Sequence, residues 1–198
     1  MIITKISQAV KTEGRYNVFV DEQYSFSLDE SQLVKLNVRK GQELTEEELA
    51  KLKDESEFGK SYIRAVDLIS RRPRSEKEIR DYAWKKQWSA EIRDRVIERL
   101  KERLYLNDEK FAESFVRSRT NTRNFSKRKM QAELMKKGIQ KELMEKVLAD
   151  SDFDESESLK NLMAKKRDKY DSTEKLVQYL ARQGFRYDHI KSALDEMQ

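Results

Sequence analysis

The chain has 198 residues, of which 40% are charged and 37% hydrophobic, and its net charge is +5. Cysteine is absent, which excludes disulfides and thiolate metal sites. No run approaches the roughly 20 apolar residues that a membrane-spanning helix needs, and the first residues lack the pattern of a signal peptide. We therefore expect a cytoplasmic protein without a membrane segment. The low hydrophobic fraction favours an elongated, mainly helical chain.

Residues 1–44 differ in pattern from the rest of the chain. Apolar and polar residues alternate with period two, which predicts three short strands at Ile2–Ala9, Tyr16–Val20 and Tyr24–Leu28. We expect them to form a small antiparallel sheet, followed by a short helix at Glu30–Leu36 and a turn at Lys40–Gly41.

A helix is predicted to link this sheet to the remainder of the chain. The sequence Thr45-Glu46-Glu47-Glu48 is a capping box, which is typical of a helix N-terminus. The polar stretch 54–60 is expected to be a junction, and from Ser61 onward the pattern indicates helices alone.

An internal repeat organises residues 61–198. Segments that begin at Ser75, Ser126 and Ser172 align without gaps, with matching apolar residues at Ile79, Met130 and Leu176. Further helices precede these segments, at Ser61–Ser70, Asp108–Arg119 and Glu157–Arg167. The sequence therefore predicts three tandem three-helix repeats that stack into an elongated, curved solenoid. The expected boundaries are 1–60 for the sheet and linking helix, then 61–107, 108–155 and 156–198 for the repeats. The second helices of the last two repeats should end near Gly138 and Gly184.

Positive charge is concentrated in the middle of the chain. Residues 61–107 carry a net charge of +5 and residues 108–150 carry +4, whereas both ends are mildly acidic. From Ser114 to Ala132 there is no acidic residue. One interpretation is a solvated helix face, and the other is a surface for a polyanionic partner. The cations proposed as the centre of such a surface are Arg117, Arg119, Arg123, Lys127, Arg128 and Lys129, with Arg71, Arg72 and Arg74 on one side and Lys136 and Lys137 on the other.

Other conspicuous side chains favour structural roles. Trp88 aligns with Ile139 and Phe185 and should be core, while Trp84 should pack between repeats. His189, the one histidine, aligns with inward positions of the other repeats, so we expect a partly buried structural side chain. No second histidine or cysteine is available for a metal site, and no cofactor motif is present.

Several short motifs occur in a distinctive order. Arg74-Ser75-Glu76 opens a helix, Leu106-Asn107-Asp108 and Phe111-Ala112 follow, and then comes Lys137-Gly138-Ile139. Their order and spacing resemble the RecX family of recombination regulators. Residues 1–44 resemble the N-terminal part of RecX proteins from Gram-positive bacteria. One departure is Thr122-Arg123-Asn124-Phe125-Ser126, which stands where the family often has a Gly-Pro-Arg-like turn.

The resemblance implies a non-enzymatic role. A RecX protein is expected to bind the RecA recombinase and its filament on single-stranded DNA. It would inhibit ATPase, recombinase and co-protease activity, and so modulate homologous recombination and the SOS response. The basic residues would contact RecA, with direct DNA contact left open, and we expect a monomer.

Two alternatives come from the residues alone. A stand-alone DNA-binding helical-repeat module would use the same basic face, because Arg and Lys bind both carboxylates and phosphates. An enzyme is the weaker alternative, since no convergent acid–base pair is evident.

Overall fold

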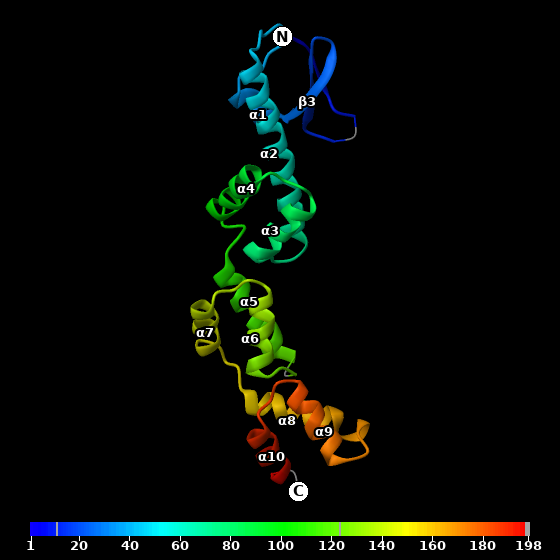
Figure 1. Cartoon of the computed structure of the whole chain (residues 1–198), viewed down its shortest axis with the longest axis vertical. Helices are drawn as coiled ribbons and strands as arrows, with labels where there is room; N and C mark the ends of the chain where they lie inside the picture. The colour runs from blue at the N-terminus through cyan, green and yellow to red at the C-terminus, as the bar shows by residue number, and fades with distance from the viewer. Residues whose placement is uncertain (11, 123, 197–198) are drawn as a thin grey trace. The chain divides into compact units, whose positions relative to one another are not determined.

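The computed structural model describes residues 1–10, 12–122 and 124–196. This chain divides into two compact units. The N-terminal unit comprises residues 1–72 and 79–105, and the C-terminal unit comprises residues 73–78 and 106–198. Figure 1 shows a small sheet at the N-terminus and helices throughout the rest of the chain, as predicted.

The predicted sheet is confirmed. Strands β1 (Ile3–Gln8), β2 (Arg15–Val20) and β3 (Gln23–Asp29) are antiparallel in the order β1-β2-β3. The β2–β3 hairpin turns at Asp21 and Glu22, whose φ angles of 49° and 64° are both positive. Positive φ at both central residues is the backbone of a type I′ turn, whose twist matches that of the flanking strands.

One face of the sheet packs against the first helices. Helix α1 (Glu30–Lys35) follows β3 directly, and helix α2 (Glu46–Arg71) starts at the predicted Thr45 capping box. Val18, Phe26 and Leu52 are buried in the core between sheet and helix. The alternating pattern of the strands is thus explained by burial of one face.

The predicted junction at residues 54–60 is wrong, because α2 continues through it for 26 residues. Its polar residues do not form a loop. Several of them bind other residues of the N-terminal unit. The Ser56 hydroxyl donates to the Ser27 carbonyl at 2.6 Å, and Asp54 and Glu55 both pair with Arg95. Helix α2 therefore belongs both to the sheet and to the first helical repeat, where it packs against α4 (Ala90–Glu102).

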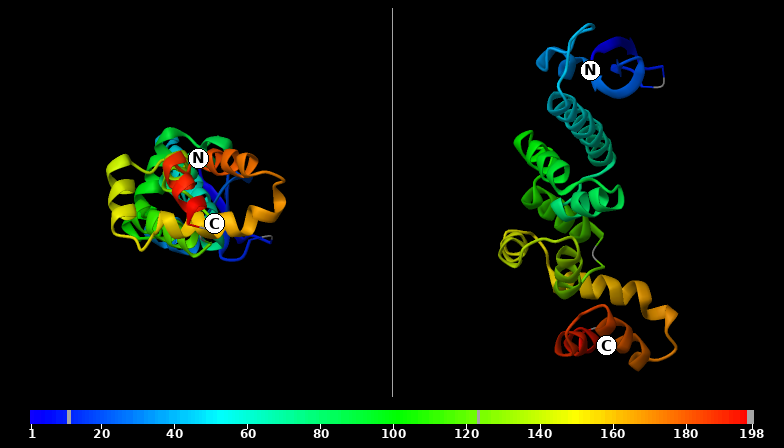
Figure 2. Two further views of the ribbon diagram at one scale, coloured as in Figure 1. Left: turned by 90° about the horizontal axis from the view of Figure 1, so that it is seen from below. Right: turned by 45° about the horizontal axis from the view of Figure 1, so that its top comes forward.

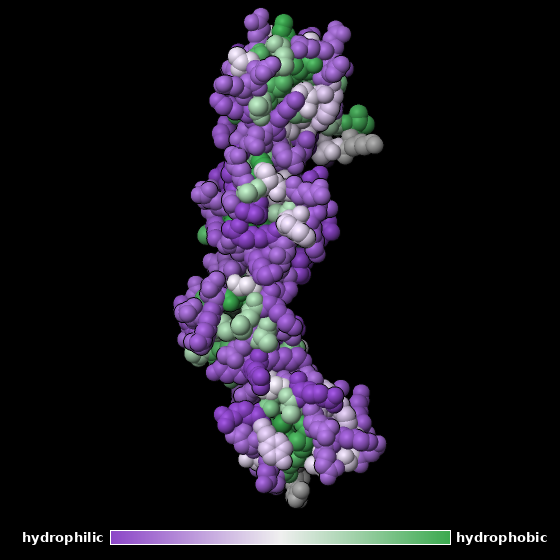
Figure 3. Space-filling model, in the orientation of Figure 1, coloured by the Kyte–Doolittle hydropathy of each residue, from purple (hydrophilic) through white to green (hydrophobic). Residues whose placement is uncertain are grey.

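The second and third repeats lie in the C-terminal unit (Figures 1 and 2). The second contains α5 (Asp108–Thr122), α6 (Lys127–Lys136) and α7 (Lys141–Ala149). The third contains α8 (Glu155–Lys166), α9 (Thr173–Arg182) and α10 (Tyr187–Asp195). Each has its own apolar core, and the aligned residues Met130 and Leu176 are buried in the two cores as predicted. Most of the visible surface is hydrophilic (Figure 3), in line with the composition.

The two repeats meet through a small polar joint. Ser126, the N-cap of α6, donates its hydroxyl proton to the Gln183 carbonyl at the end of α9, at 2.7 Å. The next residue, Gly184, has φ +94° and closes α9 in the left-handed conformation, as Gly138 closes α6 with φ +80°. A Cβ on Gly184 would lie 2.6 Å from Ser126 Oγ. The joint therefore needs glycine for two reasons, backbone conformation and space.

The predictions for Trp84 and His189 are wrong. Trp84 is 80% exposed near the end of α3 (Glu76–Lys85), and the aligned Met135 is 63% exposed, so this position faces solvent in both repeats. His189 is exposed because its neighbour Ile190 occupies the inward position. The first inward position of this helix is thus Ile92 in the first repeat but Met144 and Ile190 in the last two, one residue later, although the aligned Val96, Val147 and Ala193 are buried in all three.

Candidate partner-binding surface

Helices α5 and α6 carry four of the predicted cations on exposed positions. These are Arg117 on α5 and Lys127, Arg128 and Lys136 on α6. Among the residues that the structure describes, none of the four forms an ion pair with a carboxylate. We call these four residues the exposed basic surface. Because no carboxylate of the described residues pairs with them, we predict that they are available to an anionic partner.

The first turn of α6 opposes the usual distribution of charge in helices. A helix N-terminus carries partial positive charge, which favours acidic residues nearby. Across the described chain, α6 is the α-helix without an acidic residue in its first turn, and Lys127, Arg128 and Lys129 stand there instead. Lys129 has partners within the same unit, whereas Lys127 and Arg128 are exposed, and for these two we predict a role in binding.

The N-terminal amides of α6 are capped by the protein itself. Ser126 Oγ accepts from the Lys129 N–H at 3.0 Å, and the Glu155 carboxylate accepts from the Lys127 N–H at 2.8 Å. The same arrangement occurs one repeat earlier, where Asp108 accepts from the Glu76 N–H at 2.8 Å. Binding at this helix end therefore depends on the side chains rather than on free backbone donors.

Two predicted cations are engaged around the Asn124-Phe125 turn. The Arg119 guanidinium lies 4.8 Å from the Phe115 ring and 4.7 Å from the Phe125 ring, and it pairs with Glu133 at 3.2 Å. Lys129 Nζ lies 4.8 Å from the Phe125 ring on the same turn. Its ammonium group also donates to the Gln183 side chain at 2.5 Å. These cation–π contacts fix the turn, so both residues act in folding.

Arg119 and Arg117 provide a matched test of the division between cations that stabilise the fold and cations that are exposed and unpaired among the described residues. We expect Arg119→Gln to lower the free energy of unfolding by about 1–2 kcal/mol, because it loses two ring contacts and an ion pair that is one-third exposed. Arg117→Gln should change it by less than about 0.5 kcal/mol. Urea unfolding followed by circular dichroism measures both, and equal destabilisation by the two variants would contradict the division.

A second group of predicted cations surrounds Glu78. Lys137 Nζ pairs with the Glu78 carboxylate at 2.6 Å, and Arg74 approaches the same carboxylate at 4.0 Å. All three residues belong to the C-terminal unit, and Glu78 is only 14% exposed. Arg74 and Lys137 thus join the start of α3 to the end of α6.

The remaining predicted residues are placed elsewhere. Arg71 and Arg72 lie at the end of α2 in the N-terminal unit, where Arg71 pairs with Asp67 at 2.8 Å. Arg123 lies outside the described residues. Of the eleven cations, four are therefore exposed side chains on α5 and α6 without a carboxylate partner among the described residues. Sequence alone could not separate these four from the others, because the contacting partners are distant in the chain.

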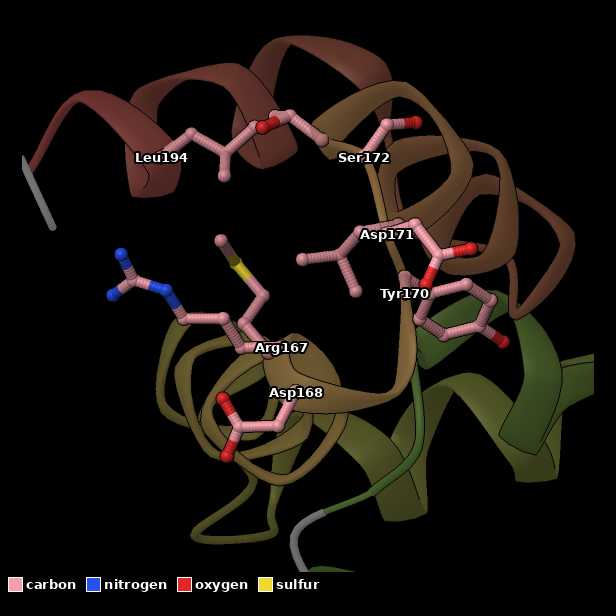
Figure 4. Close-up of a pocket in the computed structure, with 9 residues that line it drawn as sticks. Arg167, Asp168, Tyr170, Asp171, Ser172 and Leu194 are labelled. Carbon is pink, nitrogen blue, oxygen red and sulfur yellow. The ribbon is translucent and has the colours of Figure 1, made fainter.

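The pocket in Figure 4 offers no comparable chemistry. It lies in the third repeat, encloses about 410 Å³ and is lined by residues that include Arg167, Asp168, Asp171 and Leu194. In the close-up, Arg167 and Tyr170 lie on opposite sides of the opening, and the labelled polar groups do not converge. Within the described ranges, no group of three His, Asp or Glu residues could hold a metal ion. Across all the described residues, no helix combines the length and the hydrophobicity that a membrane-spanning segment requires.

Comparison with known proteins identifies the family. Three family models match, described as the regulatory protein RecX N-terminal domain at residues 1–45, the first RecX three-helix domain at 62–100 and the second at 107–148. The regulatory protein RecX of Bacillus velezensis is 37% identical over 201 residues, covering 98% of this chain and 76% of its own. The chain belongs to the RecX family of regulatory proteins.

Other relatives agree with the RecX assignment. The regulatory protein RecX of Bacillus subtilis is 36% identical over 99% of this chain and 77% of its own. A crystal structure of regulatory protein RecX superposes with a TM-score of 0.76 at 27% identity, covering 98% of both chains. RecX from Lactobacillus salivarius gives a TM-score of 0.60 at 28% identity over 70% of this chain and 95% of its own. The predicted resemblance is therefore confirmed.

Proposed function

We propose that this RecX protein is a non-enzymatic, monomeric regulator of RecA in the cytoplasm. It binds RecA and its filament on single-stranded DNA and inhibits the ATPase, recombinase and co-protease activities. In this way it modulates homologous recombination and SOS DNA repair. Contact with the partner is made by the exposed basic surface of α5 and α6.

One observation carries the proposal. The first turn of α6 has the exposed cations Lys127 and Arg128 and no acidic residue of its own, although the helix dipole favours the reverse. Arginine forks bind carboxylates and phosphates in two-point fashion, so this surface suits the anionic groups of a protein–DNA filament. The RecX family membership supports a regulatory role and directs the choice of RecA as partner.

The proposal is tested by RecA ATPase activity on single-stranded DNA, measured with and without this protein. We expect ATP hydrolysis to fall as the protein is added, because the filament can no longer grow or turn over. A titration of labelled single-stranded DNA without RecA, repeated over a salt series, distinguishes this function from that of a stand-alone DNA-binding module. If all four exposed cations replaced counterions on a single strand, the logarithmic salt slope would be about −3.

The two results distinguish the candidates. Inhibition of RecA with weak binding to bare DNA supports the proposal. Tight, salt-dependent binding to bare DNA with no added effect of RecA would identify a stand-alone DNA-binding module instead. An unchanged ATPase rate at saturating protein would overturn the proposed function.

A further inference from the structure

A buried arginine lies at the start of β2 in the N-terminal unit. Arg15 is only 6% exposed. Its Nε and Nη2 donate to Ser27, with Nη2 2.5 Å from the carbonyl oxygen. Its Nη1 is also buried and has no hydrogen-bond partner among the described residues. A buried donor on a charged group is costly when it is left unpaired.

The charge of Arg15 is also incompletely neutralised. Burial lowers the pKa of Arg15, and this effect exceeds the opposing influence of Asp29 and Glu57. Arg64 lowers the same pKa because it adds a second positive charge nearby. No carboxylate in the described chain pairs directly with Arg15. The surroundings of Arg15 can therefore accept one more anion.

A hollow of about 580 Å³ adjoins Arg15. Lys60 and Arg64 of α2 line it together with Arg15, and neither of them forms an ion pair within the described ranges. Like charges four residues apart on a helix repel each other, so this pair has no stabilising role in α2. Three cations thus face one hollow.

Beside the polar residues Thr12, Asn17 and Ser27, the lining includes side chains that are largely apolar and exposed. Ile63 is 49% exposed, Tyr24 is 55% exposed and Val10 is fully exposed. A nucleic-acid backbone would leave these groups uncovered, since its contacts are mainly polar and charged. An acidic protein segment with an apolar neighbour would satisfy the cations and cover the apolar rim together.

We infer that this hollow binds a carboxylate side chain, flanked by an apolar side chain, from a segment of a protein partner. The carboxylate accepts hydrogen bonds from Arg15, Lys60 and Arg64, and the apolar side chain covers Ile63 and Val10. The site lies in a different unit from the exposed basic surface. It therefore goes beyond the proposed function and can be tested without RecA.

The probe is the acetylated tetrapeptide amide Glu-Leu-Glu-Phe, titrated into the full-length, nitrogen-15-labelled protein. We expect the backbone amide signals of Ser27, Lys60, Ile63 and Arg64 to shift in the nuclear magnetic resonance spectrum. The matching Gln-Leu-Gln-Phe peptide should bind at least about tenfold more weakly, because it cannot form charge-assisted hydrogen bonds. Inorganic phosphate and an eight-nucleotide thymidine oligomer test the other anions.

Matched variants locate the site. Lys60→Gln/Arg64→Gln should weaken the acidic peptide about tenfold, whereas Lys51→Gln/Lys53→Gln, with the same change in charge on the same helix, should not. Absence of shifts at millimolar acidic peptide would overturn the inference. Equal binding of both peptides, equal affinity in both variants, or tighter binding of the oligomer at the same amides would also overturn it.

Discussion

Gly184→Ala is expected to lower the free energy of unfolding of the C-terminal unit by about 2–4 kcal/mol. About half of this loss comes from the left-handed backbone, which costs a residue with a Cβ about 1–2 kcal/mol. The remainder comes from overpacking, because the new Cβ would lie 2.6 Å from the Ser126 hydroxyl oxygen. Urea denaturation followed by circular dichroism measures the change.

Two further variants isolate the contact between repeats. Gly14→Ala is the backbone control, because Gly14 has φ +73° and no atom within 4 Å of the added Cβ. This variant should lower the free energy of unfolding of the N-terminal unit by only about 1–2 kcal/mol. Ser126→Gly removes the obstructing hydroxyl, so the Gly184→Ala/Ser126→Gly double variant should be more stable than the sum of the single losses by about 1–3 kcal/mol. Strict additivity would show that the two repeats do not meet at this joint in solution.

Local patterns predicted the secondary structure well. The period-two alternation of residues 16–28 depends on neighbours in the sequence, and β2 and β3 formed where it indicated. The repeated Ser and Gly positions likewise marked the starts and ends of α6 and α9. The error at residues 54–60 arose because charged residues were taken as evidence of a junction. Asp54 and Glu55 are polar since they pair with Arg95, 40 residues later or more.

The candidate surface could be predicted only in outline. The missing acids between Ser114 and Ala132 marked the end of α5 and the start of α6 as basic, because the acidic residues of α5 all precede Ser114. They could not show that Lys137 pairs with Glu78, 59 residues away, or that Lys129 contacts Gln183, 54 residues away. Such pairings depend on how the repeats pack, which composition does not contain. Arg15 was missed for the same reason, because its burial depends on the sheet and α2.

Arg117→Glu/Arg128→Glu is expected to weaken inhibition of RecA by at least about tenfold. Exposed charge pairs contribute about 0.2–1 kcal/mol each, and reversal replaces each attraction with a comparable repulsion. Two reversals therefore cost about 0.8–4 kcal/mol, and the middle of that range exceeds the roughly 1.4 kcal/mol that corresponds to a factor of ten. The fold should be retained. Both side chains are exposed, and glutamate in the first turn of α6 suits the helix dipole.

Lys110→Glu/Lys191→Glu is the matched control. Lys110 on α5 and Lys191 on α10 are exposed residues of the same unit and lie outside the exposed basic surface. This control changes the net charge by the same amount, so a general loss of electrostatic attraction would affect both double variants equally. A specific loss in Arg117→Glu/Arg128→Glu assigns binding to α5 and the start of α6.

The most direct measurement is the concentration of protein that halves RecA ATPase activity on single-stranded DNA, compared for the wild type and the two double variants. We predict that this concentration rises at least about tenfold for Arg117→Glu/Arg128→Glu and stays near the wild-type value for Lys110→Glu/Lys191→Glu. Inhibition by Arg117→Glu/Arg128→Glu at the wild-type concentration would contradict the assignment of RecA binding to the exposed basic surface.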